Sequence, residues 1–224
     1  SSIKPFKVRG ITIQVLSGLS NKTSVLCNEG LGYIVYQSDR YGFRNEDSVW
    51  DLKRHDIVAV GDSFIQGNCV PIGIVGHMRK VHSNTISLGS QGAGPLNMLG
   101  TMAEYLPRLK PRHILWFYFE GNDMSDLRTE IRRKSLLKYL EPNHRFDIPF
   151  LKKEIDKKLS VIHESMLAKR LKENRLNRVK THVLPLKGLF DVLLLRNLRR
   201  ALNLNFLSPD RSEGYFPPKG KIAE

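Results

Sequence analysis

The sequence predicts an α/β fold, in which the strands of a parallel sheet alternate with helices. Three apolar runs support this prediction, because each is followed by turn residues and then by a segment of helical character. The runs cover residues 57–60, 85–88 and 113–119. The last is largely apolar, which is typical of a strand buried on both faces of a parallel sheet. With 224 residues, the chain can bury one sizeable core.

Short β-strands are predicted ahead of this core. Residues 11–16 alternate weakly between apolar and polar side chains. Residues 25–27 and 33–36 flank the turn Gly30-Leu31-Gly32, which predicts a β-hairpin. We therefore expect a β-rich extension over residues 1–50 that packs on the core.

Helices are predicted after the first and second core strands and in the last third of the chain. The first is expected near residues 70–81, and the second begins at about Pro95, whose missing N–H is harmless in a first helical turn. Residues 124–140 and 150–180 have the composition of basic helices. Residues 186–204 form an amphipathic pattern, with leucines on one side and arginines on another.

In this interpretation the chain has four segments. The β-rich extension is followed by the α/β core over residues 51–127, a basic helical region or cap over 128–207, and a loop-like tail over 208–224. A doubly wound sheet usually has about five strands, and only three convincing ones are found. We therefore expect the core to be incomplete at its C-terminus.

The charge is unevenly placed. The formal net charge is +14, and residues 127–180 contribute sixteen Lys and Arg against seven Asp and Glu. Such a region is typical either of a solvated helical face or of a surface for an anionic partner, such as a polysaccharide, lipid headgroups or nucleic acid. We favour the solvated face, because aromatic residues are almost absent there and no nucleic-acid-binding motif is found.

Other features leave alternatives open. No run of 18 apolar residues indicates a membrane span. The helix at 186–204 can lie on a membrane surface, or pack on its own domain or on a second subunit, and we favour the packed arrangement. The two cysteines, Cys27 and Cys69, are equally compatible with a disulfide and with two buried thiols.

Residues 57–63 are the most informative stretch, because strand-forming residues are followed directly by a turn that contains a serine. In open α/β sheets the reacting groups lie at the carboxyl ends of the strands. A serine hydroxyl needs a general base to become a good nucleophile, and the tetrahedral intermediate needs N–H donors. The sequence predicts Ser63 as the nucleophile. Its oxyanion hole would be formed by the Ser63 N–H, the N–H of Gly92 and the side-chain amide of Asn122.

These segments resemble the first three signature blocks of the SGNH/GDSL hydrolase family. The matching residues are Gly61-Asp62-Ser63-Phe64, the Gly92 of Leu88-Gly89-Ser90-Gln91-Gly92, and Gly121-Asn122-Asp123. Gly42-Phe43-Arg44-Asn45 is similar to a segment of family members associated with bacterial surface carbohydrate. The resemblance covers about residues 38–127. It implies a flavodoxin-like three-layer α/β/α sandwich and an enzyme that cleaves or transfers acyl esters with no cofactor or metal.

The family's fourth block, Asp-x-x-His near the C-terminus, has no counterpart. No aspartate of the sequence is followed by histidine three residues later. Asp51 and His55 are four residues apart and precede the first core strand, which puts them at the wrong edge of the sheet. The basic region contains His144, His163 and His182. Of these, His182 has the position that best suits a base.

Two explanations follow. In the first, the sequence belongs to an active esterase or O-acyltransferase for acyl esters, such as those of a bacterial glycan, and the acid and base lie beyond residue 224. In the second, it is a complete but inactive SGNH-like module that binds carbohydrate, a membrane surface or a partner protein. We favour the enzyme, in the periplasm or cell envelope of a bacterium, and expect little or no esterase activity from residues 1–224 alone. Asp62 and Asp123 are expected to form turns.

Overall fold

The computed structural model describes the backbone of residues 3–25 and 34–183, and the side chains of these ranges up to residue 165. The chain forms two compact units, residues 1–165 and 166–224. The elements described below belong to the first unit, apart from the last part of one helix. The predicted helix at 186–204 and the tail at 208–224 lie outside the described residues. The four-segment division of the sequence stays a prediction.

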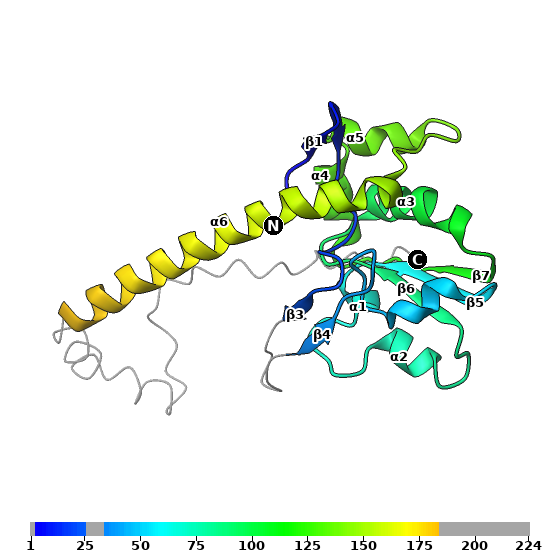
Figure 1. The fold of residues 1–224 in the computed structure, drawn as a ribbon, viewed down its shortest axis with the longest axis horizontal. Helices are drawn as coiled ribbons and strands as arrows, with labels where there is room; N and C mark the ends of the chain where they lie inside the picture. Colours follow the sequence, from blue (N-terminus) through cyan, green and yellow to red (C-terminus); the bar gives the residue numbers. More distant parts are fainter. Residues whose placement is uncertain (1–2, 26–33, 184–224) are drawn as a thin grey trace, which may run out of the picture. The chain divides into compact units, whose positions relative to one another are not determined.

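A parallel three-stranded sheet forms the centre of the first unit (Figure 1). Its strands, in the order β6-β5-β7, are β5 (His55–Gly61), β6 (Thr85–Gly89) and β7 (Pro111–Trp116). The register places Gly61 beside Gly89 and Val60 beside Trp116, so the carboxyl ends of the strands meet at one edge. The α/β prediction and its three core strands are confirmed.

Helices flank both faces of the sheet (Figure 1). They are α1 (Ser63–Gln66) and α2 (Ile74–Met78) on one face and α3 (Pro95–Tyr105) on the other. Side chains alternate along β5, as in any strand. Val58 and Val60 join the larger core together with residues of α3, whereas Ala59 packs with Ile65 and Val75 of α1 and α2.

The predicted helices agree with this arrangement in part. The helix expected from about Pro95 is confirmed and ends at Tyr105. The helix expected near residues 70–81 is shorter than predicted, because α2 occupies only Ile74–Met78. The preceding turn of helix, α1, is additional, and Gly67 ends it in the left-handed conformation, at φ 79°.

Two antiparallel strand pairs precede the sheet. The first is β1 (Phe6–Val8) with β2 (Ile11–Ile13), and the second is β3 (Thr23–Val25) with β4 (Val35–Gln37). The second pair confirms the predicted hairpin in part, because its strands overlap the predicted ranges 25–27 and 33–36 without matching their bounds, and residues 26–33 lie outside the description. Val8, Ile13 and Leu16 are buried in the larger core, which fixes this segment to the sheet.

Helices also follow the sheet. They are α4 (Asp123–Glu130), α5 (Lys134–Leu137) and α6 (Ile148–Val183), with the 3-10 turn η3 (Lys138–Leu140) between α5 and α6. Two earlier 3-10 turns, η1 (Asp47–Asp51) and η2 (Leu106–Arg108), precede β5 and β7. The two predicted basic helices are confirmed, the first as α4 and α5. Leu151, Ile155 and Leu159 are buried at a spacing of four, which turns one face of α6 to the core. The buried Glu104 accepts the N–H of Ile148 at 2.8 Å and so fixes the start of α6.

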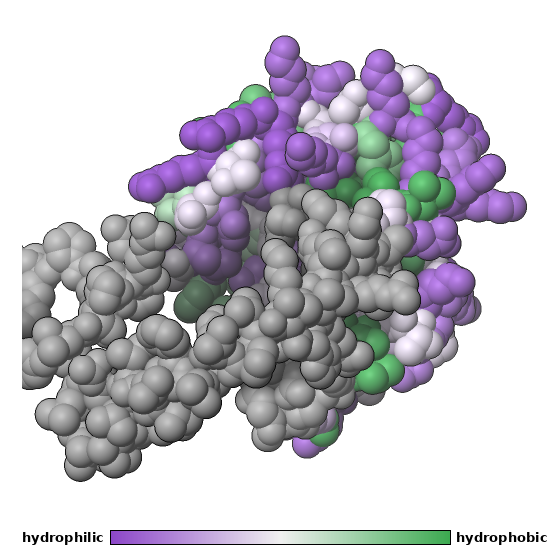
Figure 2. All heavy atoms as spheres, turned by 90° about the vertical axis from the view of Figure 1, so that its left-hand side faces the viewer, coloured by the Kyte–Doolittle hydropathy of each residue, from purple (hydrophilic) through white to green (hydrophobic). Residues whose placement is uncertain are grey.

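Hydrophilic side chains dominate much of the described surface. On the face drawn in Figure 2 they extend around smaller hydrophobic groups. Lys153, Lys157 and Lys158 of α6 are exposed, as a solvated helical face requires. No helix of the part described combines the length and the apolar composition needed to cross a membrane.

The expectation that the third strand is buried on both faces is wrong. Ile114, Leu115 and Trp116 are exposed by 46%, 37% and 49%. β7 is an edge strand, and no strand within the described ranges pairs with its outer side. Edge position alone does not cause this exposure, because β6 is the other edge strand of the described sheet and all of its residues are buried. The apolar composition of a strand therefore does not by itself determine its burial. The strand also ends at Trp116 rather than at residue 119.

Candidate active site

Ser63 lies at the carboxyl end of β5, where the sequence predicts it. It is the first residue of α1 and is half-buried. Asp62 caps this helix, since its Oδ1 accepts the N–H of Phe64 at 2.9 Å. The other carboxyl oxygen of Asp62 is buried and accepts no hydrogen bond from the described residues. Within the same residues, neither the N–H nor the hydroxyl of Ser63 has a hydrogen-bond partner.

The ends of β5 and β6 meet α1 at a distance that only glycine permits. A Cβ at Gly89 would lie 2.3 Å from the backbone nitrogen of Gln66, and one at Gly61 would lie 2.5 Å from Cγ1 of Ile65. Any side chain at these two positions would therefore push α1 away from the strand ends. These glycines allow α1, which begins at Ser63, to lie close to the ends of β5 and β6.

Gly92 lies in the loop that follows β6. The N–H of Ser90 donates to the carbonyl of Gly61 at 3.2 Å, which holds the start of this loop against the end of β5. Gly92 adopts φ 71° and is exposed, and no atom lies within 4 Å of the position that a Cβ would take. Its N–H has no partner among the described residues.

Asn122 directly precedes α4, in the loop that follows β7. Its Nδ2 donates to Asp126 at 3.0 Å, which leaves the second hydrogen of the amide for another acceptor. The rings of Phe64 and Phe119 lie 4.8 Å apart, so the Ser63 turn contacts the loop that carries Asn122. The structure thus brings the loops of Ser63 and Asn122 together.

α4 also holds the loop of Gly92. The buried Glu130 accepts the N–H groups of Gly94 at 2.8 Å, Leu96 at 2.9 Å and Asn97 at 3.3 Å. These are the donors that the first turn of α3 leaves without partners inside the helix. All three predicted site residues therefore lie on loops that are tied to one another at the carboxyl edge of the sheet.

Two acidic residues of α4 lie next to Asn122, Asp123 in sequence and Asp126 through a hydrogen bond. Asp123 is fully buried, and its Oδ2 accepts the N–H of Phe119 at 2.7 Å. Burial raises the pKa of Asp123, and the charges of Asp62 and Asp126 add to the rise, while the bond from Phe119 opposes it. Burial also raises the pKa of Asp126, against the hydrogen bond from Asn122. The local hydrogen bonds of Asp62 and Asp123 confirm that both aspartates form turns.

No histidine lies on the loops that follow β5, β6 and β7. His55 begins β5 and contacts the carbonyl of Val49 at 2.9 Å, which confirms that it lies at the opposite edge of the sheet. His144 packs against the ring of Phe146 at 4.7 Å, and His163 is exposed on α6. The side chain of His182 lies outside the described residues.

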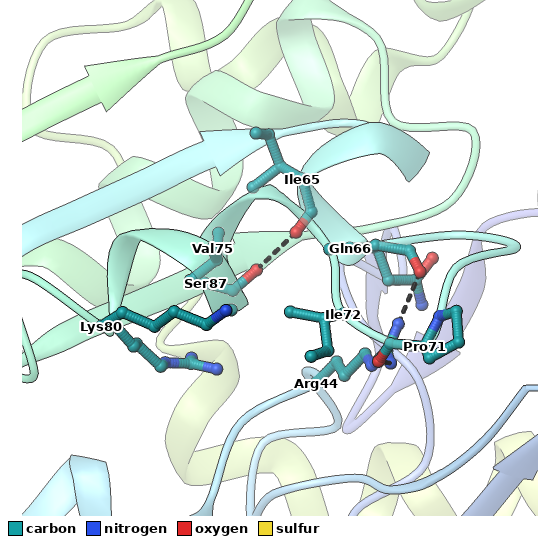
Figure 3. A pocket seen from close by; sticks show the side chains of 12 residues that line it. Arg44, Ile65, Gln66, Pro71, Ile72, Val75, Lys80 and Ser87 are labelled. Carbon is teal, nitrogen blue, oxygen red and sulfur yellow. Dashed lines mark hydrogen bonds between the residues drawn. The ribbon is translucent and has the colours of Figure 1, made fainter.

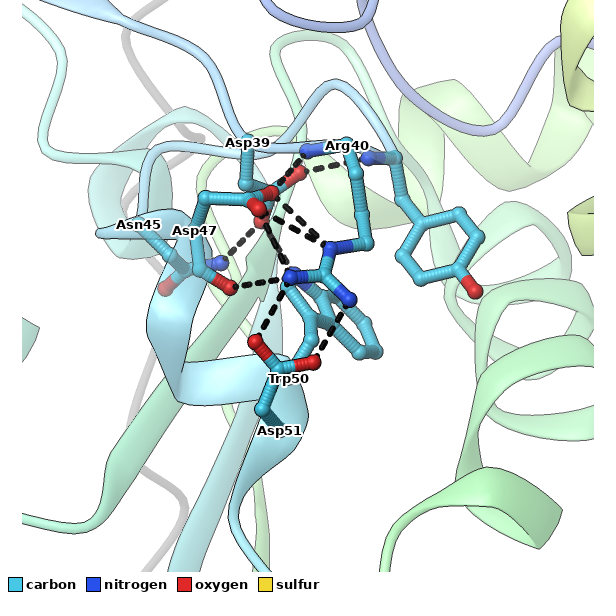
Figure 4. A network of polar contacts seen from close by, with 7 residues as sticks. Asp39, Arg40, Asn45, Asp47, Trp50 and Asp51 are labelled. Carbon is cyan, nitrogen blue, oxygen red and sulfur yellow. Dashed lines mark hydrogen bonds and ion pairs between the residues drawn. The ribbon is translucent and has the colours of Figure 1, made fainter.

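A polar network around Asp39 is not predicted from the sequence (Figure 4). The fully buried Asp39 accepts hydrogen bonds from the N–H groups of Tyr41 and Phe43 and from the side chains of Asn45 and Trp50. The Asp-x-x-Gly spacing from Asp39 to Gly42, typical of a type I turn, could have pointed to it. Asn45 then bonds both the N–H and the carbonyl of Ser87 in β6, each at 2.9 Å.

Arg44 fixes the loop after α1. Its guanidinium donates to the carbonyl oxygens of Gly67, Val70 and Pro71, the last at 2.7 Å. Cys69, in the same loop, is disulfide-bonded, and the only other cysteine of the sequence, Cys27, lies outside the described residues. Arg44 and Asn45 of the Gly42-Phe43-Arg44-Asn45 segment therefore hold the loop that follows the Ser63 helix and strand β6, respectively.

Among the described residues, no group of three or more His, Cys, Asp or Glu side chains is arranged to hold a metal ion. A scan against protein-family models and searches of curated proteins and of solved structures found no significant match.

Proposed function

We propose that the chain carries the nucleophile and oxyanion hole of an SGNH-type serine esterase or O-acyltransferase built on a flavodoxin-like three-layer sandwich. The observation that carries the proposal is that the hydroxyl and N–H of Ser63 lack hydrogen-bond partners in the described part of the chain. Ser63 also stands at the carboxyl edge beside the Gly92 and Asn122 loops. Polar groups that lie at such an edge and make no hydrogen bond to the rest of the fold are typical of an active site.

The proposed chemistry is acyl transfer. The Ser63 oxygen attacks the acyl carbonyl and passes its proton to a base, and the alcohol leaves with that proton once the ester bond breaks. The N–H groups of Ser63 and Gly92 and the amide of Asn122 donate to the oxygen that becomes negative. Water or an acceptor hydroxyl then takes the acyl group from Ser63. An acylated glycan is the proposed substrate class, on the strength of the similarity at Gly42-Phe43-Arg44-Asn45.

The proposal assigns the acid and base to a segment outside the described residues. The outer side of β7 can accept a further parallel strand, because its backbone groups are unpaired by the described residues and its faces are apolar and exposed. The carboxyl end of such a strand would lie beside the Asn122 loop. This placement would bring a histidine from that segment to the edge that holds Ser63.

The test is acetylation of the 224-residue chain by p-nitrophenyl acetate, with imidazole supplied as an external base. Peptide mass spectrometry should find one hydroxylamine-sensitive acetyl ester, on Ser63, and imidazole should accelerate its formation. Ser63→Ala should remove it. Asn122→Ala should slow it by about a hundredfold to a thousandfold, the order expected for losing one oxyanion donor.

Ser125→Ala is the matched control, because Ser125 is an exposed serine of α4 close in sequence to the site. Its acetylation pattern should equal that of the unchanged chain. Esters spread evenly over several serines, or a Ser63 ester that forms no faster with imidazole, would contradict the proposed nucleophile.

One observation favours the second candidate, an inactive module of the same fold that binds carbohydrate or a partner. The loops after the three described core strands contain no histidine. A folded chain in which Ser63 never reacts, even with imidazole present, would support this candidate over the enzyme.

A further inference from the structure

A cavity lies beside α1, lined by residues that do not include Ser63, Gly92 or Asn122 (Figure 3). It has a volume of about 300 Å³, within the range of small-molecule sites. α1, α2, the loop between them and β6 surround it. Apolar side chains form much of its wall, and they are Ile65, Pro71, Ile72 and Val75.

The charged residues that line this cavity all have the same sign. Arg44, Arg79 and Lys80 contribute to its wall, and no aspartate or glutamate does. Figure 3 shows Lys80 extending into the cavity from one side, with Arg44 and Pro71 at the other. None of the three cations takes part in an ion pair among the described side chains.

Part of this donor capacity is already used by the fold. Arg44 holds three carbonyl oxygens, as described above. Arg79 donates from Nε to the carbonyl of Thr85 at 2.9 Å and from Nη2 to Asn45. These bonds fix where its guanidinium lies, while Nη1 of Arg79 and the amine of Lys80 have no partner in the described ranges. The cavity therefore presents one cation that hydrogen bonds hold in place and, next to it, one whose amine has no partner in the described ranges.

The two arginines are also costly to keep charged where they lie. Burial lowers the pKa of Arg79, which Glu46 and Asp39 offset only through longer-range attraction. Burial lowers the pKa of Arg44 as well, opposed by Tyr36. Partly buried positive charge without a carboxylate partner favours the binding of an anion, because the anion supplies the missing compensation.

We propose that this cavity binds a phosphate group carried on a small organic molecule. A dianion matches the two positive charges of Arg79 and Lys80 better than a single carboxylate, and Nη1 of Arg79 and the amine of Lys80 can each donate to a phosphate oxygen. The apolar wall of Ile65, Ile72 and Val75 then contacts the body of the ligand. This site is separate from the proposed active site and does not depend on the role of Ser63.

Calorimetry at constant ionic strength tests the proposal, with glucose 6-phosphate, inorganic phosphate and glucose as probes. Glucose 6-phosphate should bind with one site per chain, and glucose should not bind. Lys80→Gln should weaken binding by about tenfold, the effect of losing one charged contact. The side chain of Lys80 is exposed and makes no hydrogen bond to the described residues, so this variant should fold normally.

Lys157→Gln is the matched control, since Lys157 is an exposed lysine of α6 away from the cavity. It should bind the probe like the unchanged chain. Inorganic phosphate binding as tightly as glucose 6-phosphate, with the same loss in Lys80→Gln, would support the site and identify the free ion as its ligand. Absence of saturable binding, or equal weakening in the two lysine variants, would overturn the proposal.

Discussion

The carboxylate of Glu130 accepts the N–H of Gly94 at 2.8 Å, across 36 positions of sequence. The same carboxylate takes two more N–H groups of α3, so a side chain of α4 acts as the cap of another helix. We predict that Glu130→Ala lowers the free energy of unfolding by about 2–4 kcal/mol, because three buried donors lose a charged acceptor. Urea denaturation measures this.

Glu130→Gln should cost less, because the amide keeps one acceptor oxygen for the same donors. Glu164→Ala, an exposed position on α6, provides the control and should change stability by less than about 0.5 kcal/mol. Equal stability of Glu130→Ala and Glu164→Ala would show that the cap is not needed.

Two adjacent residues of the network in Figure 4 should respond very differently to substitution. Asp39 is fully buried and accepts four hydrogen bonds, so Asp39→Asn should lower the free energy of unfolding by about 3 kcal/mol or more. Arg40 pairs with Asp47 and Asp51 at 2.7 Å, but all three side chains are at least one-third exposed. Arg40→Ala should therefore cost less than about 1 kcal/mol. Thermal unfolding of both variants checks the contrast, and similar losses would refute it.

The raised pKa of Asp123 should make the stability of the chain depend on pH. Its pKa is raised by burial, with Asp62 and Asp126 adding to the rise. A carboxyl with a higher pKa in the folded chain favours folding below its unfolded pKa and loses this contribution as the pH rises through the folded value. At pH 7 the ionised Asp123 is thus unfavourable, and Asp123→Asn should be more stable by on the order of 1 kcal/mol.

The advantage of Asp123→Asn should shrink as the pH approaches about 4, the usual pKa of an unfolded aspartate. Urea midpoints at pH 7 and pH 4 provide the measurement. Glu120→Gln, an exposed carboxyl in the preceding loop, should show no such trend. A gain in Asp123→Asn that is equal at both values of pH would contradict the assignment.

The exposed faces of β7 lead to a further prediction. Ile114→Lys should change the free energy of unfolding of the 224-residue chain by less than about 1 kcal/mol, since this side chain is 46% exposed. The variant should also aggregate less, because charge on an edge strand discourages pairing between chains. Light scattering and urea denaturation test both statements, with Val161→Lys as the exposed control on α6. A loss of several kcal/mol would show that this face of β7 is covered.

The strands and the site differ in how much of them could be predicted. β5 and β6 follow from their apolar runs because nearly all of their residues are buried. β7 has the same kind of sequence, but burial depends on neighbours in space, which a local pattern does not specify. The positions of Ser63, Gly92 and Asn122 at one edge follow from parallel topology alone.

The supports of the site could not be predicted in the same way. Glu130 reaches the first turn of α3 and Asn45 reaches β6 from more than 30 positions away in the sequence. A side chain that bonds distant backbone groups leaves no periodic signal. The turn at Asp39 has a local spacing that is typical of Asp–Gly turns, but its four-fold acceptance of hydrogen bonds depends on Asn45 and Trp50 being folded against it.

The loop glycines separate two kinds of constraint. Gly89 is limited by size, because any added carbon would meet the backbone of α1. Gly92 is limited by handedness, because its surroundings are open and only its positive φ disfavours an L-residue. A D-amino acid prefers that φ, so D-alanine at position 92 should fit the native backbone where L-alanine strains it. Position 92 therefore restricts the handedness of the residue that occupies it, and it does not restrict the size of a group that lies beside it.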